Sequence, residues 1–526
     1  MTGATGLAAI DHVVIVAYLV GVAALGIWAG GRQDSTDDYF LGGRDMPWGA
    51  VCLSVVATET STLTVISVPT VAYGGALTFV QLALGYLVGR TVVALYFLPQ
   101  YYRGHLSTAY AFLGERFGRS MQASASVTFL VTRLLADGVR LFATAIPLKL
   151  IADSVGLSMS YFQIIALIGV ITIIYTLIGG IRAVVWMDTV QMLLYLFGAV
   201  FTIVLLLGEA PPDWWQTTAE AGKTQFLKPR LGAGLAAWLT DPYALVTAVA
   251  GGAVFAMASH GTDQLVVQRL LACRDLRDSQ KALVGSALLV GVQFFLFSLI
   301  GLLLWNVHDG QTIQQLGYAA PDELFPRFIV SGLPAGMSGL LLAGIVAAAM
   351  STLSSSLNAL ASSTMLDLYE RFAGEKPSQE RAVFLSRGAT LLWGVVFIVF
   401  ANLFSSTDNP VVELGLSIAS FTYGGLLGAF LLGLVSDRAR QRDAVTAFFV
   451  TIAVTTGVIF GVWHGPQGWV FQPLDGFARA LGLGGVDTDG FSRIGYPWYA
   501  LMGSALCVGL GSVLGARHER DEKRAA

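Results

Sequence analysis

Polar side chains are concentrated inside apolar segments at four places, and these residues have the chemistry from which a function can be read. The first place is the segment 54–69, in which hydroxyl side chains and Glu59 crowd the centre and Pro69 removes one backbone donor. Such a sequence predicts a helix that unwinds locally and turns carbonyl oxygens toward a cavity. The alternative is a kinked helix whose hydroxyls bond back to its own carbonyls. The density of polar groups favours a binding site, because each buried polar group is costly in lipid.

The second place is a row of serines in the segment 347–358. Ser351, Ser354 and Ser355 have the spacing i, i+3 and i+4, which puts them on one face of a helix. Neutral oxygen ligands on one face suit a hard monovalent cation better than a soft metal. A packing seam of small residues is the alternative. A buried carboxylate elsewhere in the chain favours the ion site.

That carboxylate is Asp188, the third place. It lies about one and a half turns into an apolar helix that follows Gly179 and Gly180. An ionisable residue inside a membrane helix is by default a hypothesis for a functional site. The alternative is an interfacial aspartate paired with Arg182.

The fourth place is a charged triplet on one helix. The spacing of Arg133, Asp137 and Arg140 puts the aspartate between two arginines on one face. A structural cluster of paired charges is the slightly preferred interpretation. Alternatively, either arginine pairs with Glu59 or holds an anionic solute.

The composition indicates which kind of secondary structure positions these residues. Of the 526 residues, 55% are hydrophobic and 12% are charged, about half of the roughly 25% charged residues of a soluble protein. The apolar residues form blocks long enough to cross a bilayer as helices, and no strand alternation suggests a barrel. The sequence therefore predicts an all-α polytopic membrane protein. Its approximate apolar segments number thirteen: 11–30, 47–72, 77–101, 121–150, 158–178, 183–208, 236–268, 279–305, 330–366, 385–406, 411–435, 443–463 and 497–516.

The loop charges predict the orientation in the membrane. Most of the 31 lysines and arginines fall in one set of alternate loops. The other set holds only Lys223, Lys228, Arg230, Arg327, Arg479 and Arg493. Since positive loops stay in the cytoplasm, we expect the amino terminus outside and the carboxyl terminus inside a bacterial-type plasma membrane. The first span lacks the features of a cleaved signal peptide and is expected to remain.

Several classes of function are not supported. The net charge of −3 implies no nucleic-acid partner, and three scattered cysteines are too few for a disulfide framework or a zinc site. No metalloprotease, hydrolase or P-loop motif is present, so the sequence does not predict an enzyme. Three GxxxG pairs (Gly85–Gly89, Gly424–Gly428 and Gly511–Gly515) predict close helix packing.

In four segments the sequence resembles the sodium:solute symporter family, which includes sodium/glucose, proline and sialic-acid transporters. The motifs keep their order and spacing over roughly residues 10–440. They are Ala57-Thr-Glu-Thr60-Ser61 with Pro69, Gly179-Gly180 with Asp188 and Gln191, Gly261-Thr-Asp263-Gln264 with Gln268-Arg269, and the serine row from Ala348 to Asn358 with Asp367.

The resemblance implies a leucine-transporter-like architecture with two inverted five-helix repeats. The repeats would span 47–208 and 236–435, separated by an external loop over 209–235. An extra helix and loop (1–46) would precede them, and two extra helices with a cytoplasmic tail (436–526) would follow.

The resemblance also implies the binding residues for one or two sodium ions. The main sodium site would use the carbonyls of Ala57, Thr60 and Ala348 with the hydroxyls of Ser351 and Thr352. A second sodium would use Asp188, Ser351, Ser354 and Ser355. The candidate solute contacts are Glu59, Ser61, Thr64, Gln81, Arg133, Arg140 and Asp263.

The function implied is sodium-coupled symport of a small solute into the cell by alternating access. Sugar, monocarboxylate, amino acid and sialic acid all remain open as the solute. The alternatives are proton-coupled symport through Asp188, a membrane sensor that binds solute without accumulating it, and a channel. Sodium, the solute and the bilayer are the expected partners, and no obligate protein partner is evident.

Overall fold

The computed structural model describes residues 7–60, 62–154, 157–230, 234–318, 321–372, 377–402, 411–465, 468–472 and 491–525. Ser61 lies outside the described residues. The chain divides into two compact units, one formed by Met1–Val80, Arg133–Phe226 and Gln268–Gly415, the other by Gln81–Thr132, Leu227–Val267 and Leu416–Ala526. Three helices run from one unit into the other: α8 (Arg119–Ser154), α13 (Gln264–Leu271) and α19 (Val411–Val435).

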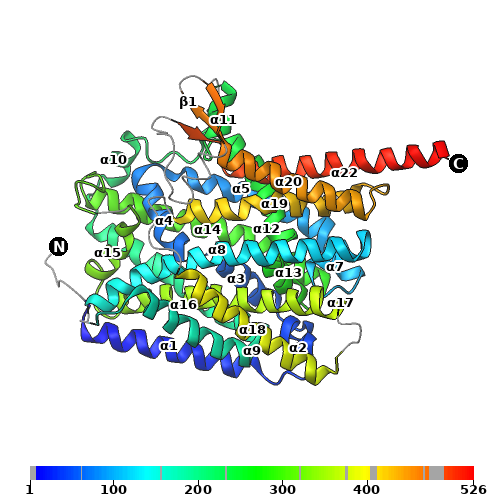
Figure 1. The fold of residues 1–526 in the computed structure, drawn as a ribbon. Coiled ribbons are helices and arrows are strands. Elements are labelled where there is room, and N and C mark those ends of the chain that lie inside the picture. Colours follow the sequence, from blue (N-terminus) through cyan, green and yellow to red (C-terminus); the bar gives the residue numbers. More distant parts are fainter. Residues whose placement is uncertain are drawn as a thin grey trace. The chain divides into compact units, whose positions relative to one another are not determined.

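The other elements of the first unit are helical. They are α1 (Ala9–Gly30), α2 (Thr36–Leu41), η1 (Gly42–Arg44), α3 (Trp48–Glu59), α4 (Thr62–Gly74), η2 (Leu77–Val80), α9 (Tyr161–Glu209), α10 (Trp214–Glu220), α14 (Leu276–Val307), η5 (Pro321–Glu323), α15 (Leu324–Ser331), α16 (Met337–Ser362), η6 (Ser363–Tyr369), α17 (Glu370–Phe372) and α18 (Gln379–Ala401). Helices α1, α16 and α18 pack against α9, and α14 packs against α3, α4 and α9 (Figure 1).

The second unit adds a small sheet to its helices. The helices are α5 (Gln81–Val92), η3 (Val93–Phe97), α6 (Leu98–Arg103), α7 (Ala109–Phe117), α11 (Gly234–Thr240), η4 (Thr247–Gly251), α12 (Gly252–Gly261), α20 (Gln441–Gly461) and α22 (Pro497–Ala525). The strands β1 (Val462–Gly465), β2 (Gly468–Phe471) and β3 (Ser492–Arg493) pair antiparallel in the order β2-β1-β3. The sequence predicts an all-α chain, and this small sheet is a departure from that prediction. These strands are too short for an alternation of apolar and polar residues to be recognised in the sequence.

The helical class is confirmed, and each of the thirteen predicted apolar segments overlaps at least one helix, although residues 403–406 lie outside the described residues. By length and composition, eight helices among the described residues can cross a membrane, or nine if α3 and α4 form one bent span. The count of thirteen crossings and the inverted repeats stay predictions. The predicted boundary between 178 and 183 appears as a break inside α9, where Gly180 has a φ of 53° that other residues rarely adopt.

Helix α16, which carries the serine row, begins at a cap supplied by α1. Asp11 is buried on α1, and its Oδ1 accepts hydrogen bonds from the backbone N–H groups of Gly336 (2.7 Å) and Gly339 (2.8 Å). These N–H groups lie at the first turn of α16 and have no partner within the helix. Asp11 therefore satisfies them and places a negative charge at the positive end of the helix dipole.

The glycine pairs mark close packing within the second unit, as predicted. A Cβ atom on Gly424 would lie 2.7 Å from the Cα of Gly503, and one on Gly85 would lie 2.7 Å from the carbonyl oxygen of Ala248. Both distances are too short for a real side chain. Glycine at these positions therefore lets α19 approach α22, and α5 approach η4 and α12.

Candidate functional site

The first predicted site contains a broken helix. Helix α3 ends at Glu59 and α4 begins at Thr62, with an angle of 61° between them. Thr60, at the break, has φ −78° and ψ 75°, outside the helical region. Pro69 lies within α4 and does not end it, so the break is nine residues before the proline that was expected to contribute to it.

The hydroxyls near the break also bond to their own backbone, as the kinked-helix alternative predicted. Thr58 Oγ1 donates to the carbonyl of Ser54 at 2.7 Å, and Thr60 Oγ1 lies 2.8 Å from the carbonyl of Val56. These bonds satisfy hydroxyls without closing the break. A break and back-bonded hydroxyls therefore coexist in this segment.

A fully buried carboxylate joins three helices beside this segment. Asp188 on α9 accepts hydrogen bonds from the Ser54 hydroxyl of α3 (2.5 Å) and from the Ser351 hydroxyl of α16. Arg269 Nη2 forms an ion pair with Asp188 Oδ2 at 3.2 Å, and neither side chain is exposed. The same guanidinium donates to Ser54 Oγ at 2.9 Å and to Ser355 Oγ. Every charge and hydroxyl of this centre thus has a partner.

The pairing of Asp188 with Arg182 was the wrong alternative. Arg182 Nε instead donates to the carbonyl of Gly42 at 3.0 Å. Arg269 was noticed in the sequence only as part of a motif, and its role as the partner of Asp188 was missed. The available signal was an arginine one residue beyond the apolar segment 236–268 and next to Leu270 and Leu271, since arginine is almost never fully buried unless it is paired.

The serine row lies on the buried face of α16, as its spacing predicts. Ser351 bonds to Asp188, Ser355 accepts from Arg269, and Ser354 Oγ donates to the Ser351 carbonyl at 3.0 Å. All side chains of the proposed main sodium site within the first unit are buried: Ala57, Thr60, Ala348, Ser351 and Thr352. Among the described residues, no group of three or more His, Cys, Asp or Glu could hold a metal ion. Oxygen ligands are therefore what this region offers.

The charged triplet also forms as predicted. Asp137 is buried, with its Oδ1 3.6 Å from Arg133 Nη1 and 3.2 Å from Arg140 Nη1. Its Oδ2 accepts a hydrogen bond from Ser356 of α16. Two guanidinium groups therefore share one carboxylate. The side chain of Arg140 is 19% exposed, and its Nε has no hydrogen-bond partner among the described residues.

The remaining candidate solute contacts do not all belong to this region. Glu59 and Thr64 flank the break and are half-buried. Gln81 belongs to the second unit, where its amide donates to the Tyr243 carbonyl at 3.1 Å. Asp263 also belongs there, and it accepts from the N–H of Leu265 (2.9 Å) and the hydroxyl of Tyr423 (2.8 Å). These contacts give Gln81 and Asp263 structural roles, and their contact with solute stays a prediction.

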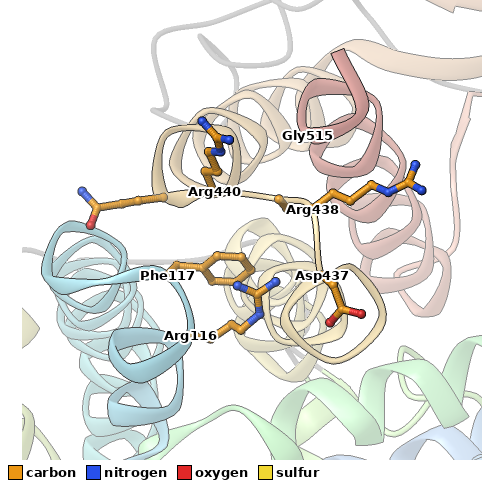
Figure 2. Close-up of a pocket in the computed structure, with 8 residues that line it drawn as sticks. Arg116, Phe117, Asp437, Arg438, Arg440 and Gly515 are labelled. Carbon is orange, nitrogen blue, oxygen red and sulfur yellow. The ribbon is translucent and has the colours of Figure 1, made fainter. Parts of the chain in front are cut away.

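A cavity of about 390 Å³ in the second unit contains none of the predicted site residues. It is lined by the end of α7, the connection from α19 to α20, and Gly515 of α22 (Figure 2). Arg116 lies over the ring of Phe117 at 4.8 Å, and Figure 2 shows Arg438 and Arg440 extending away from that ring. All three arginines belong to the loop set predicted to face the cytoplasm. The cavity is therefore a feature of that charged surface.

Comparison with known proteins identifies the family. The model of the sodium:solute symporter family matches residues 39–451. The chain belongs to the sodium:solute symporter family.

Similar family members cover most of the chain. The sodium/sialic acid symporter SiaT of Proteus mirabilis is 28% identical over 86% of this chain and 90% of its own length. The human sodium/iodide cotransporter is 29% identical over 86% of this chain and 70% of its own length. A solved structure of a Na⁺-coupled sialic acid symporter, substrate-bound and outward-open, has a TM-score of 0.80 at 26% identity and covers 97% of this chain and 98% of its own.

A more distant structure shares the fold alone. The nucleobase-cation-symport-1 transporter Mhp1 has a TM-score of 0.52 at 13% identity, covering 91% of this chain and 94% of its own. Members of the family are transporters, and the similar proteins are coupled to sodium. This chain is a multi-pass membrane protein of that family, and the relationships support sodium-coupled symport of a solute.

Proposed function

We propose that this symporter carries a small organic anion into the cell together with sodium, by alternating access in the plasma membrane. The observation that carries the proposal is the Asp188 centre, which ties the broken helix to the serine row through Ser54 and Ser351. Ser54 precedes Ala57 by one helical turn, and Ser351 follows Ala348 by one turn. This arrangement supports a main sodium site at Ala57, Thr60, Ala348, Ser351 and Thr352.

The chemistry of the centre favours sodium. The Ser351 hydroxyl donates its proton to a carboxylate, so its oxygen keeps lone pairs for a cation and gains electron density from the charged acceptor. Carbonyl and hydroxyl oxygens suit hard cations. Carbonyls at the end of α3 have no continuing helix to satisfy them, and a sodium ion would do so.

A second sodium, at Asp188, Ser351, Ser354 and Ser355, would have to share the carboxylate with Arg269. A like charge close to a site disfavours another cation. The second ion is therefore the weaker of the two in this proposal. Its binding requires the ion pair of Arg269 and Asp188 to lengthen or to rearrange.

The charged triplet supports an anionic solute. The side chain of Arg140 is 19% exposed, and its Nε has no hydrogen-bond partner among the described residues, so this guanidinium keeps a donor that a solute can use. Arginine is suited to bind a carboxylate by two parallel hydrogen bonds. The relatives are named for sialic acid, iodide and monocarboxylates, all of which are anions at neutral pH.

Two sodium ions with one monovalent anion would carry one net charge inward. A membrane potential of 100 mV then supplies about 2.3 kcal/mol per cycle, before the sodium gradient is counted. Binding of sodium and solute must favour each other, because coupling between two sites is reciprocal. The predicted repeats at 47–208 and 236–435 would move relative to each other during the cycle.

Uptake into proteoliposomes with an imposed inward sodium gradient tests this function. Radiolabelled pyruvate and sialic acid serve as carboxylate probes, with glucose and proline as the comparison. We expect a carboxylate to accumulate only when sodium is outside in excess. Accumulation of glucose or proline alone would overturn the anion assignment. Uptake driven by a pH gradient without sodium would indicate proton coupling, and saturable binding without accumulation would indicate a sensor.

A further inference from the structure

A buried amide lies at the break between α3 and α4. Gln293 is in the middle of α14, and its side chain has no exposed surface. Its Oε1 lies 2.7 Å from the hydroxyl of Thr60, the residue at which α3 stops. An amide in an apolar helix is costly unless it is hydrogen-bonded. The presence of a buried amide at the break therefore requires a structural or functional explanation.

Helix α14 follows both halves of the broken helix, and Gln293 lies between the two close approaches. A Cβ atom on Gly285 would lie 3.3 Å from Sγ of Cys52 in α3. One on Gly301 would overlap the carbonyl oxygen of Pro69 in α4. The helix thus contacts each half through glycine and the break through an amide. Helix α14 therefore supports a segment that has no continuous series of helical hydrogen bonds of its own.

The hydrogen bonds at the break are incomplete. Thr60 has one hydroxyl proton but two acceptors within reach, the Val56 carbonyl at 2.8 Å and Gln293 Oε1 at 2.7 Å, so only one of them is satisfied at a time. The Val56 carbonyl already accepts the Thr60 N–H at 2.8 Å. The Gln293 Nε2 is buried and has no hydrogen-bond partner among the described residues. The amide therefore has hydrogen-bonding capacity left over at this point.

We propose that Gln293 is a positioning residue of the main sodium site. By accepting the Thr60 hydroxyl, it holds the end of α3 in the conformation that leaves carbonyl oxygens available to sodium. Its spare N–H groups take a partner when the break rearranges during the transport cycle. This inference rests on the proposed function, since it acts through the carbonyl of Thr60.

The test measures sodium affinity and sodium-free stability separately. Sodium replaces potassium at constant ionic strength. The sodium Kd is taken from the way the melting temperature of the purified protein rises with sodium concentration. Gln293→Met removes the amide at nearly constant volume, and Thr60→Val removes the hydroxyl but keeps the backbone carbonyl. Each change should raise the sodium Kd about tenfold, the size expected from losing one buried hydrogen bond. The double variant should bind sodium no more weakly than either single variant, because both remove the same interaction.

A matched control lies on the same helix. Ser298 is fully buried on α14, and its hydroxyl also lacks a partner among the described residues. Ser298→Ala should leave the sodium Kd unchanged. If Gln293→Met fails to fold, Thr60→Val carries the test, with Ser298→Ala as its control.

The outcomes separate this inference from the function on which it rests. If the wild-type protein shows no sodium-specific stabilisation, the proposed function fails. If the wild type binds sodium and Gln293→Met binds it equally well, the inference alone is wrong. A lower melting temperature in potassium with an unchanged sodium Kd would make Gln293 a packing residue, and this result would also overturn the inference.

Discussion

Asp188 and Arg269 neutralise each other where neither side chain reaches solvent. Removing one partner of a buried ion pair leaves an uncompensated charge, which costs about 3–5 kcal/mol. Asp188→Asn should therefore lower the melting temperature strongly, and Asp188→Asn combined with Arg269→Gln should recover most of it. The double variant should still lose the cooperativity of sodium binding, because the second site lacks its carboxylate.

The control for this pair is an exposed one. Asp153 and Lys149 are 3.1 Å apart, with side chains 47% and 32% exposed. Surface pairs contribute little, so Asp153→Asn should leave the melting temperature nearly unchanged. Sodium cooperativity that survives the loss of Asp188 would contradict the second site and favour one ion per cycle.

Arg140 is the residue of the charged triplet on which solute recognition is expected to depend. Its side chain is partly exposed and has an unpartnered Nε among the described residues. Arg140→Gln should raise the solute Kd about tenfold to a hundredfold, as expected from losing a hydrogen bond to a charged group. Stabilisation by sodium alone should persist.

Binding of the carboxylate probe is measured by isothermal titration in saturating sodium. Arg274→Gln is the control, since its pair with Asp45 is 61% exposed on both sides. If Arg140→Gln binds the solute normally, the triplet is the structural cluster that the sequence also allowed.

At the scale of elements, the start of α16 depends on a residue of α1. Asp11→Ala removes the acceptor for two backbone N–H groups and should lower the free energy of unfolding by about 0.5–2 kcal/mol. Asp11→Asn should cost less, because it keeps an acceptor oxygen and loses only the charge near the helix dipole. Thermal unfolding in the same detergent gives both values. Val13→Ala, on the exposed surface of α1, is the control, and equal stability of Asp11→Ala and wild type would show that the cap contributes nothing.

The elements also show what the sequence could and could not predict. Helices were predictable because apolar blocks of membrane-spanning length leave the backbone few other ways to satisfy its hydrogen bonds. The break at Thr60 could be placed only within a segment, because hydroxyls and a proline disfavour a helix without saying which bond is lost. The serine face followed from helical spacing alone. Arg269 and Gln293 could not be assigned, because their partners Asp188 and Thr60 are distant in the sequence and no local pattern links them.

For the whole molecule, the loop charges predict the orientation in the membrane. The three native cysteines are buried, so an introduced exposed cysteine should dominate labelling by a membrane-impermeant maleimide. Thr217→Cys lies in the predicted external loop and should react on intact cells. Arg442→Cys lies on the predicted cytoplasmic side and should react only after permeabilisation. The reverse pattern would invert the predicted topology.

Sodium binding at the main site, which includes Ser351, is the central claim, and the melting temperature in sodium against equal potassium tests it most directly. A ligand that binds only the folded state stabilises it by about 2.7 kcal/mol at a hundred times its Kd. We predict a sodium-specific rise for the wild type and for Ser386→Ala, a buried serine on α18 that donates to its own helix. Ser351→Ala should need far more sodium for the same rise. Equal melting temperatures of the wild type in sodium and potassium, or a Ser351→Ala curve that matches the wild type, would contradict the account.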